Sequence, residues 1–220
     1  MSRAIESSGP AEPDRNCPRC PRLVALRTRC RDRERDWFNA PVPSFGPRNA
    51  RLLVVGLAPG LKGANRTGRP FTGDFAGGLL YETLRQHHFA RGRYEARADD
   101  GLRLIDCRIA NAVRCVPPDN KPSGAEIANC REFLENTIAE MPRLAAILAL
   151  GRIAHDSVLA CFGARPSRAP FGHGRVHAIG GLQLYDSYHC SRQNTNTGRL
   201  TPTMFAGVFA EIRAQLDKPA

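Results

Sequence analysis

Four cysteines stand in settings suited to metal binding. Cys17 and Cys20 form a C-x-x-C pair in a proline-containing turn, Cys115 precedes two prolines, and Cys130 lies on a predicted helix. A C-x-x-C pair holds two thiolates at the spacing that a tetrahedral metal ion or a cubane iron-sulfur cluster needs. The spacing alone does not distinguish iron and sulfide from zinc, and a thiol-redox pair is a further alternative.

The other four cysteines carry a weaker signal. Cys107 and Cys161 lie within apolar segments, where we expect buried thiols. Cys30 and Cys190 have no assigned role. Since we expect a reducing cytosolic setting, thiols and metal ligands are favoured over disulfides.

A second group of reactive side chains follows the apolar run 52–56. The loop Gly-Leu-Ala-Pro-Gly at 56–60 continues through turn residues to Phe71 and Asp74. It contains neither the Gly-Lys-Ser/Thr ending of a P-loop nor the G-x-G-x-x-G of a dinucleotide site. Taken alone, the segment favours an ordinary loop in which Phe71 fills the core and Asp74 caps the next helix.

Two further polar strings follow later apolar segments. One runs from Asn111 to Pro122 and contains Asn120, and the other starts at His189 and ends at Asn194. Each has an ordinary structural alternative, because an Asn-Lys-Pro turn caps the backbone and a histidine at a strand end is often structural. Asn111 is different, since an amide on an otherwise apolar strand needs hydrogen-bond partners.

The elements that position these strings alternate along the chain. Short apolar runs alternate with helical patterns, which predicts a single-domain α/β/α sandwich with a central, mainly parallel four-stranded sheet. The carboxyl ends of parallel strands share one edge, so 56–60, 111–121 and 187–199 are expected there. The predicted strands are 52–56, 105–113, 144–150 and a hairpin-like pair at 176–179 and 182–185, and the predicted helices are 77–88, 123–141, 153–162 and 201–216.

Length and charge restrict the class of protein. The 220 residues suit one domain, which we place at 16–220 after a flexible tail at 1–15. The formal charge is +11, and nearly all of the cations are arginine. An arginine excess favours a DNA or RNA partner, although a GC-rich genome would inflate arginine as well. The apolar runs are too short to cross a membrane and no secretory signal is evident, so we expect a cytoplasmic monomer without membrane contact.

Taken together, the strings at 56–74, 111–122 and 189–194 resemble the uracil-DNA glycosylase superfamily, and most closely its family 5, the iron-sulfur enzymes called type B. The resemblance runs from about Cys17 to the last predicted helix. It implies a DNA glycosylase of base excision repair that flips uracil or another deaminated base out of DNA, hydrolyses its N-glycosidic bond and leaves an abasic site.

The resemblance also implies a cofactor and catalytic residues. A 4Fe-4S cluster would be held by Cys17, Cys20, Cys115 and Cys130. Other families of the superfamily carry an acid in the first glycine loop, where this chain has Leu57 and Ala58, so the role of the base would fall to Asp74. Asn120 would help to hold the attacking water, and His189 would donate to the base oxygen that gains charge.

Further residues would bind the substrate. Those expected to contact the extruded base are Gly56, Leu57, Ala58, Phe71 and Asn111. Those expected to contact the DNA backbone or to fill the vacated stack are Arg66, Ser191, Arg192, Gln193, Asn194 and Arg199. Asn111 would favour uracil, although members of this family also accept purines such as hypoxanthine.

One alternative from another class is a non-catalytic, arginine-rich nucleic-acid-binding module stapled by zinc. It explains the charge and the C-x-x-C pair equally well. It leaves the combination of acid, aromatic ring and histidine unexplained.

Overall fold

The computed structural model describes residue 5 and residues 9–218, and its centre is a five-stranded sheet with the order β4-β1-β5-β7-β6. Four strands run parallel: β4 (Cys107–Asn111), β1 (Leu52–Gly56), β5 (Ala146–Leu150) and β7 (Leu182–Ser187). The fifth, β6 (Val176–Ile179), pairs antiparallel with β7 at the sheet edge. The predicted α/β class with a mainly parallel sheet is confirmed.

The predicted number of strands in the sheet is wrong by one. The four parallel strands match the expectation, but the first arm of the predicted hairpin joins the same sheet as β6. Gly180 and Gly181 connect the two arms with φ of 56° and 82°. Two consecutive positive φ values produce a tight turn whose twist matches an antiparallel pair. The hairpin therefore extends the sheet instead of standing apart from it.

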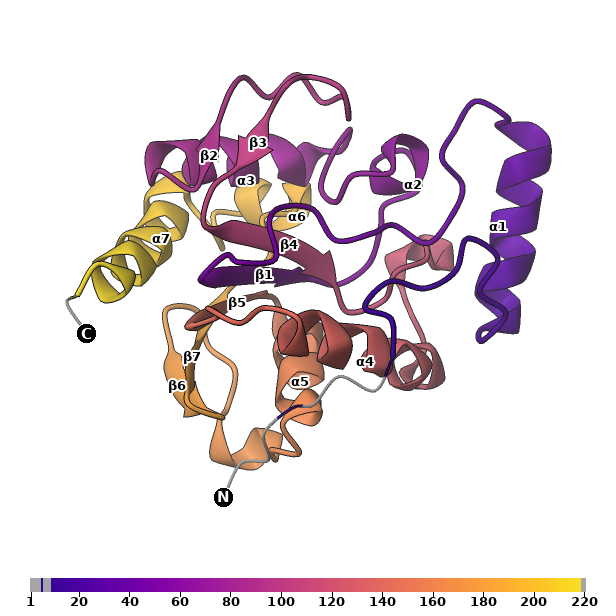
Figure 1. Cartoon of the computed structure of the whole chain (residues 1–220). Helices are drawn as coiled ribbons and strands as arrows, with labels where there is room; N and C mark the ends of the chain where they lie inside the picture. The colour runs from indigo at the N-terminus through magenta and orange to yellow at the C-terminus, as the bar shows by residue number, and fades with distance from the viewer. Residues whose placement is uncertain (1–4, 6–8, 219–220) are drawn as a thin grey trace.

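Helices cover both faces of the sheet. α3 (Phe75–Gln86) and α7 (Pro202–Leu216) pack on one face, and α4 (Gly124–Ala139) and α5 (Arg152–Cys161) pack on the other (Figure 1). Both helical layers of the predicted α/β/α sandwich are thus present, one on each face of the sheet.

Strand β1 shows why the sheet is buried on both faces. Leu52 and Val54 join the cluster under α3 and α7, whereas Leu53 and Val55 join the cluster under α4 and α5. All four side chains are fully buried, so the strand is a continuous apolar run without polar alternation. Strand β4 is buried along its whole length in the same way.

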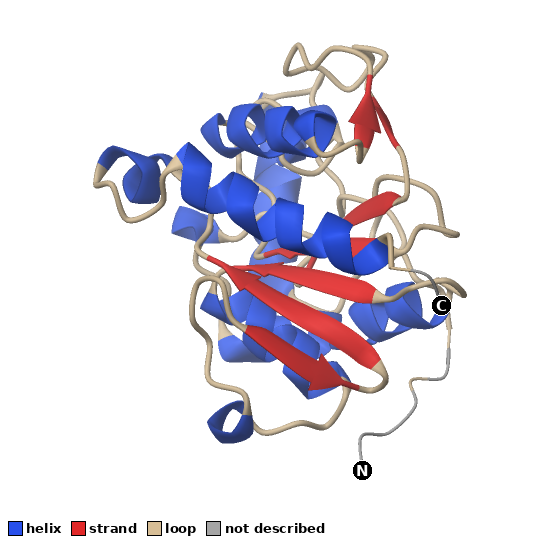
Figure 2. Cartoon of the chain, turned by 90° about the vertical axis from the view of Figure 1, so that its left-hand side faces the viewer, coloured by secondary structure: helices blue, strands red, loops and turns tan. Residues whose placement is uncertain are grey.

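Several helix starts follow local sequence signals. Ser123 and Glu126 form a complete capping box at α4, and the Thr201 side chain accepts a hydrogen bond from the Met204 N–H at the start of α7. The N-terminal basic segment forms a helix, α1 (Pro21–Arg33). Figure 2 shows the helices around the strands, with a pair of short strands apart from the main sheet. The shorter elements are α2 (Ala64–Thr67), β2 (Ala90–Arg91), β3 (Arg103–Leu104), η1 (Pro118–Asn120), η2 (Pro166–Arg168) and α6 (Arg192–Asn196).

The predicted flexible tail at 1–15 is packed where it is described. Ile5 contacts the apolar cluster under α4 and α5. A Glu12 carboxylate oxygen lies 3.2 Å from the fully buried guanidinium of Arg114. A buried cation needs such a counterion, so this contact holds Glu12 against Arg114. Residues 1–4 and 6–8, which the prediction also covers, lie outside the described residues.

Within the described part of the chain, none of the helices has the length and apolar character needed to cross a bilayer.

Two adjacent glycines on α3 provide a test of how this helix packs against the loop that contains Phe71. A Cβ at Gly77 would overlap the Phe71 carbonyl oxygen and the Tyr94 hydroxyl, whereas a Cβ at Gly78 would meet nothing within 4 Å. We expect Gly77→Ala to lower the free energy of unfolding by about 2 kcal/mol through overpacking. Gly78→Ala should raise it by about 1 kcal/mol, since alanine favours the helix. Equal effects in urea unfolding would contradict this seating of α3.

Candidate active site and cysteine cluster

A cavity of about 1210 Å³, counting its part open to solvent, lies where the parallel strands end. Its walls come from the segments that follow β1, β4 and β7 and from the start of α3. These are the three segments expected at the carboxyl edge of the sheet, so the structure brings them together as predicted.

Asp74 reaches this cavity as the first residue before α3. Its Oδ1 accepts a hydrogen bond from the Gly77 N–H at 3.2 Å, which makes it the helix cap. Its Oδ2 faces Gly60 and Gly63, because a Cβ built on either glycine would lie 3.3 or 2.5 Å from it. One carboxylate oxygen therefore caps the helix, and the other faces the loop after β1.

The environment of Asp74 makes it a stronger base than an exposed aspartate. Burial raises the pKa of the carboxyl group, and hydrogen bonds from the Gly77 and Ala76 backbone oppose that increase only in part. A carboxylate with a raised pKa takes up a proton more readily. The absence of side chains on Gly60 and Gly63 leaves the space that this oxygen needs.

Phe71 and His189 form an aromatic wall of the cavity. Their rings are stacked, with centroids 5.8 Å apart and an interplanar angle of 29°. A Cβ on Gly56 would lie 2.6 Å from the Phe71 ring, so only glycine fits beneath it. Phe71 has a φ of 53°, an uncommon backbone conformation for a bulky residue. The Tyr94 hydroxyl donates to the Phe71 carbonyl at 3.2 Å and helps to hold that conformation.

His189 is a neutral imidazole at physiological pH. Burial lowers its pKa to about 4, because removal from water disfavours the cation. A neutral imidazole carries one N–H donor and no charge. Asn194 holds the backbone at this position, since its Nδ2 donates to the His189 carbonyl at 2.8 Å.

Asn111 ends β4 on the cavity floor. Its side chain is 2 % exposed, and its Oδ1 has no hydrogen-bond partner in the described part of the protein. An unpaired buried amide oxygen costs about 1 to 3 kcal/mol. The position is crowded as well, because a Cβ on Gly56 would lie 2.5 Å from that oxygen. The unpaired Oδ1 of Asn111 is therefore available to accept a hydrogen bond from a ligand.

Asn120 and its neighbour Asp119 also line the cavity and are exposed. Both have a φ of 55°, so this short turn projects two polar side chains in succession. Sequence reasoning selected Asn120 but missed Asp119. Its place next to Asn120 in the Pro-Pro-Asp-Asn-Lys-Pro string was the available signal.

Most of the predicted site residues border this cavity. Gly56 packs directly beneath Phe71, as described above, while Arg66, Asn194 and Arg199 lie outside the cavity lining. Arg66 is exposed on α2, and Arg199 lies over the Tyr188 ring. The predicted residues that line the cavity are Leu57, Ala58, Phe71, Asp74, Asn111, Asn120, His189, Ser191, Arg192 and Gln193.

Phe75 is a cavity residue that the sequence reasoning missed. It follows Asp74, lines the cavity and remains 45 % exposed. The Arg192 guanidinium lies over its ring at 5.2 Å from the centroid. An exposed aromatic ring paired with an arginine suits contact with nucleobases. The sequence provided only a weak signal for Phe75, because the helix was predicted to begin at residue 77 and not at 75.

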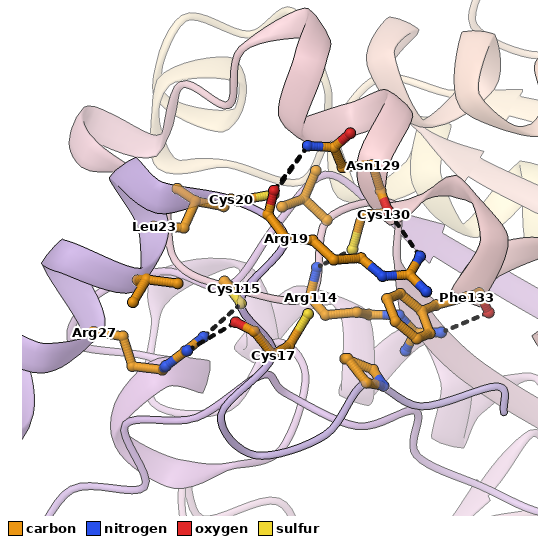
Figure 3. A pocket seen from close by; sticks show the side chains of 13 residues that line it. Cys17, Arg19, Cys20, Leu23, Arg27, Arg114, Cys115, Asn129, Cys130 and Phe133 are labelled. Carbon is orange, nitrogen blue, oxygen red and sulfur yellow. Dashed lines mark hydrogen bonds between the residues drawn. The ribbon is translucent and has the colours of Figure 1, made fainter.

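The four predicted metal ligands lie together at one end of the molecule. Cys17 and Cys20 precede α1, Cys115 follows β4, and Cys130 lies on α4. Their side chains surround one small space bordered by Leu23 and Phe133 (Figure 3). The sequence placed these cysteines in one set, and the structure brings them together.

Hydrogen-bond donors point at three of the sulfur atoms. The Arg114 N–H donates to the Cys130 Sγ at 3.3 Å, the Arg27 guanidinium to the Cys115 Sγ at 3.6 Å, and the Asn129 amide to the Cys20 Sγ at 3.8 Å. Figure 3 shows these donors around the same space. Such donors stabilise negative charge on sulfur.

Burial opposes that charge when the thiols stand alone. It raises the pKa of Cys115 to about 12, and it also raises the pKa values of Cys20 and Cys130. Buried thiols of this kind ionise only when a cation binds them. The donor set is therefore one that could hold a metal.

The remaining cysteines lie elsewhere. Cys107 and Cys161 are buried, as predicted, and the two unassigned residues, Cys30 and Cys190, are buried too. None of the eight forms a disulfide in the described chain.

With the geometry established, comparison with known proteins identifies the class. Residues 43–213 match the Uracil DNA glycosylase superfamily. The matched region contains the central sheet and the whole cavity. The fold and the site thus define an α/β protein of the uracil-DNA glycosylase class.

Individual relatives narrow this class further. The chain is 45 % identical to the type-5 uracil-DNA glycosylase of Thermus thermophilus over 90 % of this chain and 92 % of that protein. It is 41 % identical to the type-5 uracil-DNA glycosylase of Pyrobaculum aerophilum over 90 % of this chain and 88 % of the relative. A type-4 uracil-DNA glycosylase from Pyrobaculum aerophilum is 32 % identical over 80 % of this chain and 78 % of that protein. The chain belongs to the uracil-DNA glycosylase superfamily, as a member of its type-5 family.

The protonation of His189 gives a direct test of the site. Because burial places its pKa at about 4, the ring should stay neutral as the pH falls from 8 to about 5. A histidine in water would titrate near 6.5. An NMR titration should therefore show a ring, assigned with His189→Gln, that does not shift near pH 6.5. A midpoint close to 6.5 would contradict the partly buried, neutral imidazole.

Proposed function

We propose that the chain hydrolyses the N-glycosidic bond of uracil and other deaminated bases in DNA, after base flipping, and leaves an abasic site. One observation carries this proposal: a buried unpaired acceptor, a neutral histidine and a partly buried carboxylate face a single cavity. Family membership supports the same chemistry, because the named relatives are uracil-DNA glycosylases.

In this proposal Asn111 and Phe71 recognise the extruded base. The base edge of uracil offers an N–H donor beside a carbonyl acceptor, which complements the oxygen and nitrogen of an amide side chain. The donor would satisfy the unpaired Oδ1 of Asn111. The Phe71 ring would stack on the base. The free energy spent on leaving Asn111 unpaired would then be recovered on binding.

Cleavage of the glycosidic bond moves positive charge to the sugar and negative charge to the base. His189 would donate its N–H to a base oxygen as that oxygen gains charge. Being neutral, it stabilises the leaving base without protonating it in the ground state. Asp74 would stabilise the cationic sugar and orient the water that attacks it, through the oxygen that does not cap α3.

Asn120, which lines the same cavity, would help to hold this water. Its exposed amide lies on the turn that projects into the cavity next to Asp119. Asp74 and Asn120 together give a water one strong acceptor and one further hydrogen-bond partner. That combination positions the water oxygen for attack.

DNA would bind across the mouth of the cavity. Ser191 caps the short helix α6, and the next two residues, Arg192 and Gln193, line the cavity and are exposed. Arg66 is exposed on α2, which follows the loop after β1 in the chain. Arginines in these places would bind backbone phosphates, which positions the duplex without reading its sequence.

For the cofactor we propose a 4Fe-4S cluster held by Cys17, Cys20, Cys115 and Cys130. Around a zinc ion the four sulfur atoms would lie about 3.8 Å apart, given a Zn–S distance of about 2.3 Å. Among the described residues, no three of these sulfur atoms lie within 4.8 Å of one another. The wider spacing fits a cubane better than a single ion. Such a cluster would supply a covalent tie between α1, the loop after β4, and α4.

The zinc-stapled binding module has less support than the enzyme. A module that only binds nucleic acid has no use for a buried amide oxygen without a partner or for a carboxylate raised in pKa. The domain at 16–220, the monomeric state and the cytoplasmic location remain predictions.

A base-release assay tests the proposed activity. The purified protein is incubated with an oligonucleotide that contains one uracil, and part of the sample is then heated in alkali. We expect free uracil by mass spectrometry and strand scission only after alkali, since hydrolysis leaves an abasic site. Intact DNA, or scission without alkali, would contradict a monofunctional glycosylase.

Asn111 separates binding of the base from stability of the fold. Asn111→Ala removes the contacts to the base edge, so kcat/KM for uracil release should fall by about tenfold to a hundredfold. The melting temperature should not fall, because the side-chain oxygen that is lost has no partner among the described residues. A large drop in melting temperature with normal kcat/KM would assign Asn111 a structural role instead.

The metal content tests the cofactor. Protein purified without oxygen should be brown and contain about four irons per chain. Cys130→Ala should lose iron and melt at a lower temperature, since metal binding is coupled to folding. Cys161→Ala, the control at another buried cysteine, should keep its iron. Colourless protein with one zinc per chain would contradict the cluster.

A further inference from the structure

Two histidines and an aspartate form a second cluster of metal-binding side chains near the edge of the sheet. His155 lies on α5, His177 on β6 and Asp186 on β7, and we call them the His-Asp-His cluster. One ligand atom from each residue lies within 4.8 Å of the other two. His155 and Asp186 are fully buried, and His177 is half-buried. None of the three lines the base cavity or the space between the four cysteines.

The Asp186 carboxylate joins the two imidazole rings. Its Oδ1 lies 2.6 Å from the His155 Nδ1, and its Oδ2 lies 3.2 Å from the His177 Nε2. Two imidazole nitrogens and one carboxylate oxygen form a donor set that Zn²⁺ accepts. Around a zinc ion such atoms lie about 3.3 Å apart, given zinc–ligand distances of about 2.0 to 2.1 Å. The His177–Asp186 pair has this separation already, and the His155–Asp186 pair needs to open by about 0.7 Å.

Hydrogen bonds outside the cluster orient two of the three ligands. The His155 Nε2 lies 2.8 Å from the Ala169 carbonyl, which can only accept, so this nitrogen donates and Nδ1 is left for an ion. The Gly172 N–H donates to the Asp186 Oδ2 at 3.2 Å. Histidines that bind a metal donate their other ring N–H to such an acceptor, and ligating carboxylates are hydrogen-bonded in turn. The cluster therefore has the outer contacts of a metal site as well as its ligands.

The charge around the cluster favours a cation. Asp186 is fully buried, and a buried carboxylate needs a counterion. Its ion-pair partners among the described residues are the two histidines of the cluster. A second carboxylate, Asp156, lies close enough to His155 to stabilise positive charge there. The Asp156 Oδ1 is itself buried without a hydrogen-bond partner in the described part of the chain.

An ion can reach the cluster from the surface. His177 and Ala169 line a hollow of about 980 Å³, counting its part open to solvent. A water from this hollow can take the fourth position of a tetrahedral ion. Arg165 and Arg168 line the hollow too, but both are exposed, so water and salt screen their charge. On the buried side, the Phe171 ring packs against the His155 ring with centroids 5.6 Å apart.

From this arrangement we propose that His155, His177 and Asp186 bind a zinc ion, with a water as the fourth ligand. The ion takes the place of the proton between His155 and Asp186, and that proton leaves to solvent. The role of the ion is structural. Strand β6 lies at the sheet edge and pairs with β7 alone, so a metal tie from both strands to α5 holds the hairpin on the domain. The site is independent of the proposed glycosylase chemistry and of the proposed iron-sulfur cluster.

Zinc binding to the full chain is the first test. The protein is dialysed against a zinc chelator, its remaining metals are counted, and Zn²⁺ is added by isothermal titration. We expect one further zinc ion per chain. At free zinc about a hundredfold above Kd the melting temperature should rise by about 5 to 10 °C, because a ligand that binds only the folded chain stabilises it.

Variants assign the bound ion to the cluster. In His177→Gln the side-chain amide still donates to Asp186 but is a poor zinc ligand, so the fold should persist. Zinc affinity should fall at least about a hundredfold, since loss of an outer contact alone costs about tenfold to a hundredfold. Asp186→Asn, which removes the charged ligand, should lose affinity as well. His88→Asn is the matched control, an exposed histidine whose φ of 60° asparagine tolerates, and it should bind zinc like the wild type.

X-ray absorption at the zinc edge separates this cluster from the cysteine set. Zinc in the cluster has nitrogen and oxygen neighbours at about 2.0 to 2.1 Å, whereas zinc on thiolates has sulfur at about 2.3 Å. Three results would overturn the inference. They are a chelated protein that takes up no zinc, bound zinc surrounded by sulfur, and a His177→Gln variant that binds zinc as tightly as His88→Asn.

Discussion

The site depends on how the Asp74 carboxylate is shared. Its Oδ1 caps α3 through the Gly77 N–H, and its Oδ2 faces the loop after β1. This hydrogen bond holds the Asp74 side chain in one orientation. A carboxylate without it would be free to rotate. It also requires a close approach of α3 to the Phe71 carbonyl, which only glycine at 77 permits. One interaction thus places the carboxylate and the aromatic wall at the same time.

The cysteine set connects the cavity to the outer parts of the chain. Cys115 and Asn120 lie on one short segment after β4, so a cluster bound by the cysteine set would influence the position of the cavity turn. Arg22 on α1 reinforces this link, because its guanidinium donates to the Lys121 carbonyl at 2.9 Å and to Glu126. The proposed cluster, α1 and the start of α4 would therefore act on one segment of the site.

Local patterns predicted the parts of the fold that local interactions determine. The apolar run at 52–56 and the capping box at Ser123 appear as expected. The sequence could not show that the hairpin arm at 176–179 joins the main sheet, since that depends on β7 and its parallel neighbour. The packing of Glu12 against Arg114 was equally hidden, because the two lie far apart in sequence. Most residues that line the cavity were predicted from the three motif strings. Phe75 and Asp119 could be identified only once the folded cavity was seen.

We propose that Asp74 carries out chemistry while it caps a helix. Asp74→Asn keeps an oxygen for the Gly77 N–H and replaces the charge at the second oxygen. The direct measurement is the single-turnover rate of uracil release, recorded with DNA affinity and a thermal melt on the same preparation. We expect a rate loss of about 10² to 10⁴ with affinity and melting temperature nearly unchanged. Near-normal release, or loss of folding and binding together with activity, would contradict it.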